Sequence, residues 1–127
     1  MRKKKTPRQK LKAELDKLSK QYIKMRDNHI CQKCGKPVKD QDQHWSHVVP
    51  KSAGNRLRWE PLNLKVLCMY CHQWWHKNPI ESGRWFMEKF PERYVFLEQE
   101  KQKGAKKFTM DELEELRDWY IRSIENF

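Results

Sequence analysis

The run from Cys68 to His76 holds the residue types best suited to chemistry in this chain. Cys68 and Cys71 form one Cys-x-x-Cys pair, and His72 and His76 follow four residues apart. On a helix, side chains at that spacing lie on the same face, as two ligands of one metal ion must. The segment therefore predicts two metal sites side by side, although two interfacial histidines on a Trp-rich helix are the alternative interpretation of the His pair.

The four cysteines of the chain form two Cys-x-x-Cys pairs, Cys31 with Cys34 and Cys68 with Cys71, which are separated by 33 residues. Thiolates on two tight turns can bind one Zn²⁺ tetrahedrally, and Gly35 supplies the backbone freedom that such a turn needs. A redox Cys-x-x-Cys would normally stand alone. The spacing predicts a structural zinc site, whose four thiolates leave no open position for catalysis.

A second set of polar residues stands before and after the second cysteine pair in the sequence. It consists of His44, His47, Asn63, His72 and His76. The segments His47-Val48-Val49-Pro50, Asn63-Leu64 and Cys71-His72 with His76 resemble the HNH nuclease motif. The fuller run from Arg58 to Pro79, with Trp85 beyond it, resembles phage HNH endonucleases of the NinG/Rap recombination type. The resemblance is specific from Cys31 to Pro79 and looser in the C-terminal helices.

The resemblance implies a ββα-metal fold, in which a two-stranded hairpin and one helix hold a divalent ion. It implies that His47 is the general base, that Asn63 braces the loop, and that His72 and His76 bind the ion. Neutral imidazole can take a proton from water near pH 7, and a metal can relieve charge on the phosphate and stabilise the leaving oxygen. Family members of this kind leave a 5′-phosphate and a 3′-hydroxyl.

The third ligand of the catalytic ion is the least defined position. Many HNH proteins place Asp or His directly before the base, where this chain has Ser46. On a strand Ser46 shares its side with His44 and Asp42. We expect His44 to be the ligand, with Asp42 and Ser46 as alternatives. Three imidazoles suit Zn, Mn or Ni, whereas Mg prefers oxygen; we expect Mn²⁺ or Mg²⁺, with Zn²⁺ or Ni²⁺ as alternatives.

The charge distribution indicates a nucleic-acid partner. The formal net charge is +11, and residues 1–40 hold 14 Lys/Arg and 4 Asp/Glu, a net +10. Phosphates attract such a segment, while a solubilising tail is the alternative. Lys51, Arg56 and Arg58 are candidate phosphate contacts, or alternatively parts of a solvated loop. The Trp residues of the central region predict core packing more strongly than base stacking.

The chain has 127 residues, which is the size of one domain with room for an appended arm or helix. Its hydrophobic share is 37% and its charged share 35%, so the core should be small and a metal should help to hold it. The sequence contains no apolar run of signal-peptide or membrane-spanning type. We therefore expect a cytoplasmic protein, in the host cytoplasm if phage-encoded, with no membrane partner.

The expected fold class is α+β, a mostly helical chain around a small ββα-metal core stapled by the zinc site. The expected elements are a flexible basic arm over 1–9, helices over 10–28, 69–78, 80–90 and 91–102, and strands over 43–49 and 64–67. A linker over 103–107 precedes a last helix opened by a Thr109–Glu112 capping box. The nuclease domain would span 10–102 with its core at about 31–79, and 103–127 would pack on it.

These patterns predict a metal-dependent endonuclease that hydrolyses DNA phosphodiester bonds with low sequence specificity, by nicking and in some contexts double-strand cutting. One alternative is a non-catalytic zinc-knuckle module for duplex or branched DNA in recombination or packaging. Another is a phage packaging factor whose nuclease acts only inside a complex. The sequence leaves phage recombination or packaging proteins as further partners and does not decide between a monomer and a homodimer.

Overall fold

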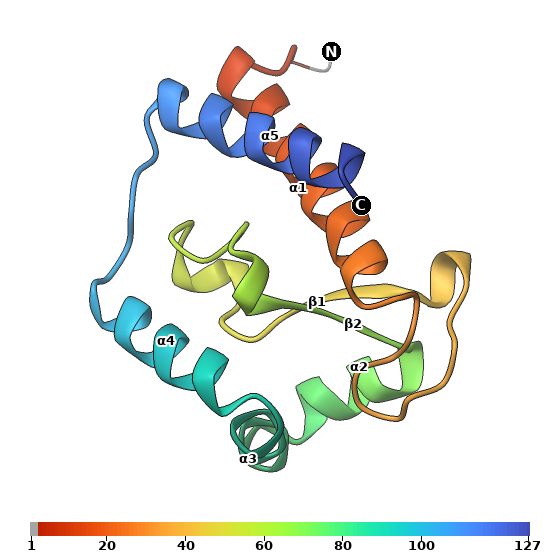
Figure 1. Cartoon of the computed structure of the whole chain (residues 1–127). Helices are drawn as coiled ribbons and strands as arrows, with labels where there is room; N and C mark the ends of the chain where they lie inside the picture. Colours follow the sequence, from red (N-terminus) through yellow and green to blue (C-terminus); the bar gives the residue numbers. More distant parts are fainter. Residues whose placement is uncertain (1–2) are drawn as a thin grey trace.

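The computed structural model describes residues 3–127; Met1 and Arg2, the start of the expected basic arm, lie outside the described residues. The helices and strands are α1 (Pro7–Arg26), β1 (His44–His47), β2 (Leu64–Leu67), α2 (Met69–Lys77), α3 (Pro79–Lys89), α4 (Pro91–Gln102) and α5 (Met110–Glu125). Short 3-10 turns lie at Asp40–Asp42, Lys51–Ala53 and Pro61–Asn63. The expectation of a mostly helical α+β chain with two short strands is confirmed (Figure 1).

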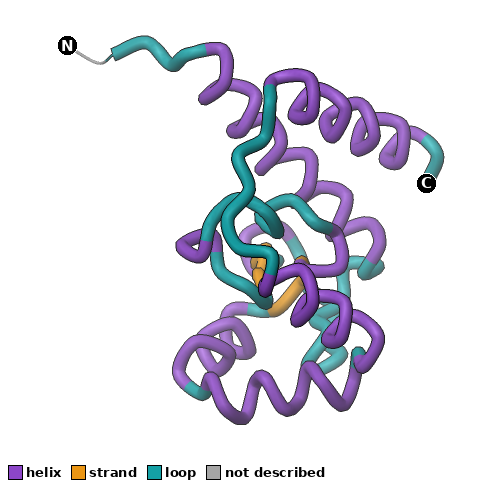
Figure 2. Tube along the Cα trace, turned by 90° about the vertical axis from the view of Figure 1, so that its left-hand side faces the viewer, coloured by secondary structure: helices purple, strands orange, loops and turns teal. Residues whose placement is uncertain are grey.

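The sheet consists of β1 and β2, which pair antiparallel with His44 opposite Leu67 and His47 opposite Leu64. In Figure 2 the two strands lie between the long terminal helices and the remaining helices. Cys68 separates β2 from α2 and caps that helix, so the second strand leads directly into it. β1 is shorter than the expected run of 43–49. Val48 still donates its N–H to the backbone oxygen of Asn63, but the Asn63 N–H donates to the Glu60 oxygen instead of returning the bond.

Helix α1 begins earlier than expected, at Pro7 instead of Lys10. Thr6 forms a capping box with Gln9, and proline is well tolerated in the first helical turn. Residues 7–9 are therefore helical and not part of a flexible arm. The helix ends at Arg26, before Asn28 turns into the left-handed region with a φ of 55°.

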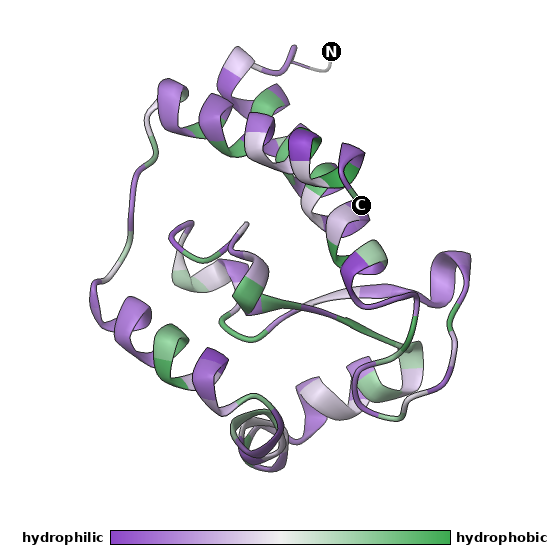
Figure 3. Cartoon of the chain, in the orientation of Figure 1, coloured by the Kyte–Doolittle hydropathy of each residue, from purple (hydrophilic) through white to green (hydrophobic). Residues whose placement is uncertain are grey.

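Helix α5 packs against α1 and closes a small core at one end of the molecule. This core contains Leu11 and Leu15 from α1, Leu113 and Tyr120 from α5, and Trp59 from the loop between the strands. Figure 3 shows apolar residues on the sides where the two helices meet. The expected capping box of Thr109 and Glu112 is present, and the Tyr120 hydroxyl donates to the backbone oxygen of Trp59. The C-terminal helix is thus tied to the loop between the strands.

The larger core lies around β2, all of whose residues are buried. It includes Ile23, Leu64, Val66, Leu67, Trp75, Phe86 and Leu97 from five elements. Trp45, Trp74 and Trp85 pack against this core, and Trp59 is buried in the other one, so the core interpretation of these rings is confirmed. No helix within residues 3–127 combines the length and apolar character that crossing a membrane requires.

Candidate metal centre and active site

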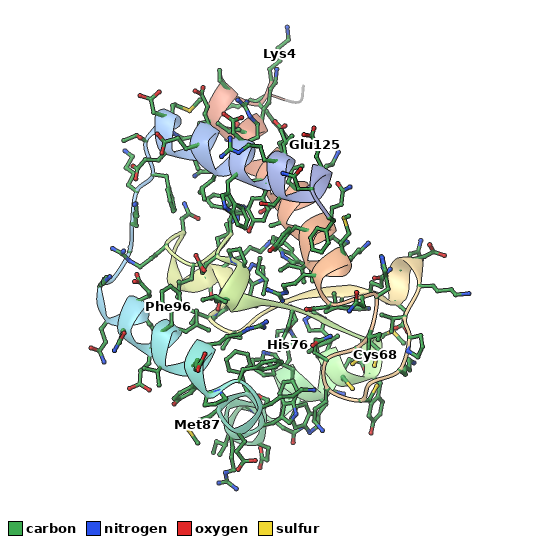
Figure 4. The ribbon with its side chains drawn as sticks, in the orientation of Figure 1. Lys4, Cys68, His76, Met87, Phe96 and Glu125 are labelled. Carbon is green, nitrogen blue, oxygen red and sulfur yellow. The ribbon has the colours of Figure 1, made fainter. Side chains whose placement is uncertain are left out.

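The four cysteine sulfurs form one cluster between the loop after α1 and the first turn of α2. All four Sγ atoms lie within 4.8 Å of one another, and those of Cys34 and Cys68 are 4.0 Å apart. Four sulfurs bound tetrahedrally to Zn²⁺ at about 2.3 Å would be about 3.8 Å apart. The side chains therefore fit a structural metal such as zinc, and Figure 4 shows the sulfur atoms gathered beside Cys68.

Tight backbone turns bring these sulfurs together. Gly35 has a φ of 77° and donates its N–H to the Cys31 oxygen at 2.9 Å, a conformation that favours glycine. At the other pair, Cys68 caps α2, and the backbone N–H of Cys71 lies 3.4 Å from the Cys68 sulfur. Each pair thus sits on a tight turn, and at the second pair that turn directs an N–H group toward sulfur.

The thiol pKa values show how strongly this cluster is desolvated. Burial raises the pKa of both Cys68 and Cys71 above that of an ordinary thiol. Burial also opposes ionisation of Cys31, but N–H groups of Cys34, Cys68 and Lys33 outweigh it and lower the Cys31 pKa to about 7. Without a cation Cys68 and Cys71 would be neutral thiols at pH 7, so a bound metal would change the charge and the stability of the cluster together.

The three histidines expected to hold the catalytic ion lie in a row. His44 Nδ1 is 2.9 Å from His72 Nδ1, and His72 Nε2 is 3.0 Å from His76 Nε2. Two imidazole nitrogens that share one ion at about 2.0–2.1 Å would be about 2.8–3.4 Å apart, so either contact has a suitable spacing. His76 is exposed and marks the open end of the row.

The row does not yet form a three-histidine site, because His72 uses a different nitrogen in each contact. One ion can bridge only one of the two pairs unless the His72 ring turns. Apart from the four cysteines, no three His, Cys, Asp or Glu side chains within residues 3–127 bring one ligand atom each within 4.8 Å of one another. The described chain thus has a complete four-sulfur site and a histidine pair with a third imidazole beside it.

The two alternative third ligands have other partners. The Ser46 hydroxyl is buried and accepts a hydrogen bond from Lys65 Nζ at 3.0 Å. The Asp42 carboxylate accepts the N–H of Met69 at 2.8 Å, at the start of α2, and lies 3.5 Å from Lys36 Nζ. Of the three candidates on this side of the strand, His44 is the one whose side chain contacts His72.

His47 is held so that one ring nitrogen is free to act as a base. Its Nε2 lies 3.0 Å from the backbone oxygen of Arg58, and a carbonyl oxygen can only accept. In the neutral ring Nε2 must therefore carry the hydrogen, which leaves the lone pair on Nδ1. Burial lowers the pKa of His47 to about 4, and burial is also the main reason why the pKa of His72 falls to about 4. Both rings are neutral at pH 7.

The Asn63 side chain is buried and makes three hydrogen bonds to the loop between the strands. Its Oδ1 accepts from the N–H of Val49 at 2.8 Å, and its Nδ2 donates to the oxygens of Val49 at 3.0 Å and Leu57 at 2.9 Å. Val49 stands near the start of that loop and Leu57 just past its middle. These contacts are the ones that a loop brace requires.

Two of the three expected phosphate contacts have partners inside the chain. Arg56 Nε donates to the backbone oxygen of Gly104 at 2.7 Å, and the Arg58 guanidinium binds the Asp16 carboxylate at 3.1 and 2.7 Å. Lys51 is exposed, with its ammonium 5.2 Å from the centroid of the Trp45 ring. Lys51 therefore remains better placed to meet a phosphate than either arginine.

The sequence alone did not predict that two further residues, Lys65 and Asp16, lie at the site. Lys65 is fully buried, with its ammonium 3.5 Å from the centroid of the Trp75 ring, although it stands inside an apolar strand. Asp16 lies among the polar residues of α1 and contacts the loop that holds His47. Neither residue has a spacing that would distinguish it from a surface residue.

Comparison with known proteins gives one match. The family model described as Bacteriophage Lambda NinG protein matches residues 1–127, which is the whole chain and includes both cysteine pairs and all the histidines. No curated protein and no solved structure matches the chain.

Proposed function

Since the chain belongs to the bacteriophage lambda NinG family, we propose from its histidine row that it is a metal-dependent DNA endonuclease of the HNH type. The observation that carries the proposal is that the chain combines a neutral His47 ring held by a backbone carbonyl with a histidine row spaced for a metal ion. His47 has a neutral ring whose Nε2 faces a carbonyl, while His72 and His76 are spaced to share an ion on α2. A binding module needs neither feature. The antiparallel strands followed by α2 would then be a ββα-metal core.

The proposed reaction is hydrolysis of a phosphodiester bond. His47 Nδ1 takes the proton of the attacking water, because Nε2 is already occupied by the Arg58 carbonyl. A divalent ion held by His72 and His76, with His44 completing the set, would supply charge relief on the phosphate and the leaving oxygen. Asn63 keeps the loop in place while His47 exchanges its proton.

The four-cysteine site is proposed to be structural zinc that orients this machinery. Cys71 and His72 are consecutive residues in the first turn of α2. A metal bound by the sulfurs would fix the start of the helix, and the helix would fix the direction of both imidazoles. The catalytic ion is proposed to be Mn²⁺ or Mg²⁺, with Zn²⁺ or Ni²⁺ as alternatives that imidazole ligands would also accept.

The DNA partner is supported by the outer face of α1. Lys10, Lys17, Lys20 and Lys24 recur at helical spacing on one side of this helix, opposite the buried Leu11 and Leu15. Within the described chain no carboxylate lies within 4 Å of these four ammonium groups. A row of unpaired lysines fits the phosphates of duplex or branched DNA, which it would bind without reading sequence.

A non-catalytic zinc-knuckle DNA-binding module is the second candidate. The observation that favours it is that His72 faces His44 and His76 with different nitrogens, so a three-ligand metal site would need a ring rotation. Such a module would act within recombination or packaging complexes as a monomer or homodimer. It predicts tight DNA binding without cutting under any metal condition.

Plasmid relaxation separates these candidates. Zinc-loaded wild type and His47→Ala would be incubated with supercoiled DNA and Mn²⁺, Mg²⁺, Ni²⁺, added Zn²⁺ or EDTA. His29→Ala is the matched control, since His29 is exposed and contacts Gln43 instead of the row. Nicking by wild type and the control, but not by His47→Ala, supports the nuclease. Binding without nicking by wild type in every metal would favour the module.

A further inference from the structure

We infer that Asp16 is a positioning residue, which holds the backbone carbonyl that orients His47. This inference rests on the proposed role of His47, but its first readout is independent of cleavage. Asp16 lies on α1, outside the strands and helix that carry the histidines. Its link to His47 runs through Arg58 and Trp59, two consecutive residues of the loop between the strands.

One carboxylate receives three hydrogen bonds from this loop. Asp16 Oδ1 accepts from Arg58 Nε at 3.1 Å and from Trp59 Nε1 at 2.8 Å, and Oδ2 accepts from Arg58 Nη2 at 2.7 Å. The Arg58 guanidinium also lies over the Trp59 ring, 4.9 Å from its centroid. A bidentate arginine pair with a third donor has one favoured geometry, so both side chains are fixed relative to α1.

Fixing these side chains also fixes the carbonyl between them. The backbone oxygen of Arg58 belongs to the peptide unit that joins Arg58 to Trp59, and it faces His47 Nε2 at 3.0 Å. The Trp59 ring is anchored by burial as well as by Asp16. Loss of the carboxylate would free the Arg58 side chain first, and the peptide unit could then rotate away from the imidazole.

The three hydrogen bonds that Asp16 accepts from Arg58 and Trp59 form a clamp, and its effect should not be limited to stability. The Arg58 and Asp16 side chains are 22% and 25% exposed, so this partly buried bidentate pair also contributes to folding. A small displacement of the Arg58 carbonyl would also change the tautomer of His47. The hydrogen bond that a neutral imidazole makes determines which of its nitrogens carries the hydrogen. Loss of the carboxylate should therefore affect the His47 tautomer in addition to the fold.

The test compares Asp16→Asn with Glu14→Gln. Glu14 is an exposed carboxylate on the same helix, so both changes remove one negative charge from α1. In ¹⁵N NMR of zinc-loaded protein at pH 7, wild type and Glu14→Gln should show His47 with its hydrogen on Nε2. Asp16→Asn should show a mixture of the two tautomers. A His47 signal in Asp16→Asn identical to that of the control would overturn the inference.

Single-turnover cleavage provides the second readout. Asp16→Asn should lower the rate roughly tenfold, as expected for a misplaced catalytic group, while its Kd for duplex DNA equals that of Glu14→Gln. An unchanged rate, or equal losses of rate and affinity, would count against positioning. If wild type does not cleave at all, the proposed function fails, whereas the tautomer measurement still decides whether Asp16 orients His47.

If Asp16→Asn does not fold, Arg58→Lys provides the test. This variant keeps the positive charge beside Asp16 but loses the two parallel N–H bonds. The same change of His47 tautomer in Arg58→Lys supports the clamp. A wild-type tautomer in a folded Arg58→Lys would overturn it.

Discussion

Cys71 and His72 are consecutive residues of α2, yet their side chains belong to two different clusters. The Cys71 sulfur lies in the four-cysteine group, and the His72 ring contacts His44 and His76. Because the residues share a helical turn, any metal that orders the sulfurs also orders the imidazoles. We therefore expect the proposed catalytic site to depend on the sulfur site.

This dependence predicts different outcomes for substitutions in the two clusters. Cys68→Ser should lower the melting temperature by more than about 10 °C, because a structural metal contributes several kcal/mol to a domain of this size. His76→Ala should melt within about 3 °C of wild type and lose cleavage, since His76 is exposed. Circular dichroism melts with a zinc assay measure both, and a larger loss of stability in His76→Ala would contradict the two-cluster account.

The pKa of His47 predicts the pH dependence of cleavage. Burial lowers this pKa to about 4, so the ring stays neutral and able to accept a proton as pH falls through 6.5. The unfolded chain takes up that proton near pH 6.5, so His47 makes folded stability decline as pH falls from 6.5 toward 4. Single-turnover rates over pH 5.5–8 should therefore show no acid limb centred near 6.5. A limb at that pH would mean that His47 is solvated.

The lysine face of α1 predicts a steep salt dependence of DNA binding. In the inactive His47→Ala background, alanine at Lys10, Lys17, Lys20 and Lys24 should weaken binding and reduce the slope of log Kd against log salt by roughly 3–4.

The matched control places alanine at four exposed lysines outside α1, Lys39, Lys101, Lys103 and Lys107, and so removes the same charge. Fluorescence anisotropy with a labelled duplex measures both slopes. Equal losses in the two variants would mean that net charge, and not the α1 face, attracts DNA.

The hydrogen bonds of the Asn63 side chain to the loop predict that its removal lowers the free energy of unfolding. Asn63→Ala leaves the N–H of Val49 and the oxygen of Leu57 without their side-chain partner, which should cost about 2–3 kcal/mol. Asn78→Ala removes a single bond to the Trp74 oxygen near the surface and should cost less than about 1 kcal/mol. Urea unfolding of both variants provides the comparison, and equal costs would argue against a brace.

Local signals account for the elements that the sequence predicted well. β2 is a short apolar run at Leu64–Leu67, and α4 and α5 begin at a proline and at a capping box. The same kind of signal at Thr6 and Gln9 marks the true start of α1 at Pro7, whereas the expected helix began at Lys10.

The contacts that sequence could not predict are pairings between distant segments. Nothing in the spacing of Asp16 and Arg58 indicates that they meet, so Arg58 read as a phosphate contact although its guanidinium binds α1. Lys65 is buried because Ser46 and the Trp75 ring surround its ammonium, which a strand pattern does not reveal. Histidine spacing on α2 was predictable, whereas the choice of nitrogen by His72 depends on tertiary packing.

The most direct test of the central claim is the cleavage rate of zinc-loaded His47→Ala under single-turnover conditions with Mn²⁺. Removal of a general base predicts a loss of about 10²–10⁴-fold relative to wild type, in a protein that remains folded and keeps its zinc content. Wild-type and His47→Ala rates that agree within twofold would contradict the assignment of His47 as the base.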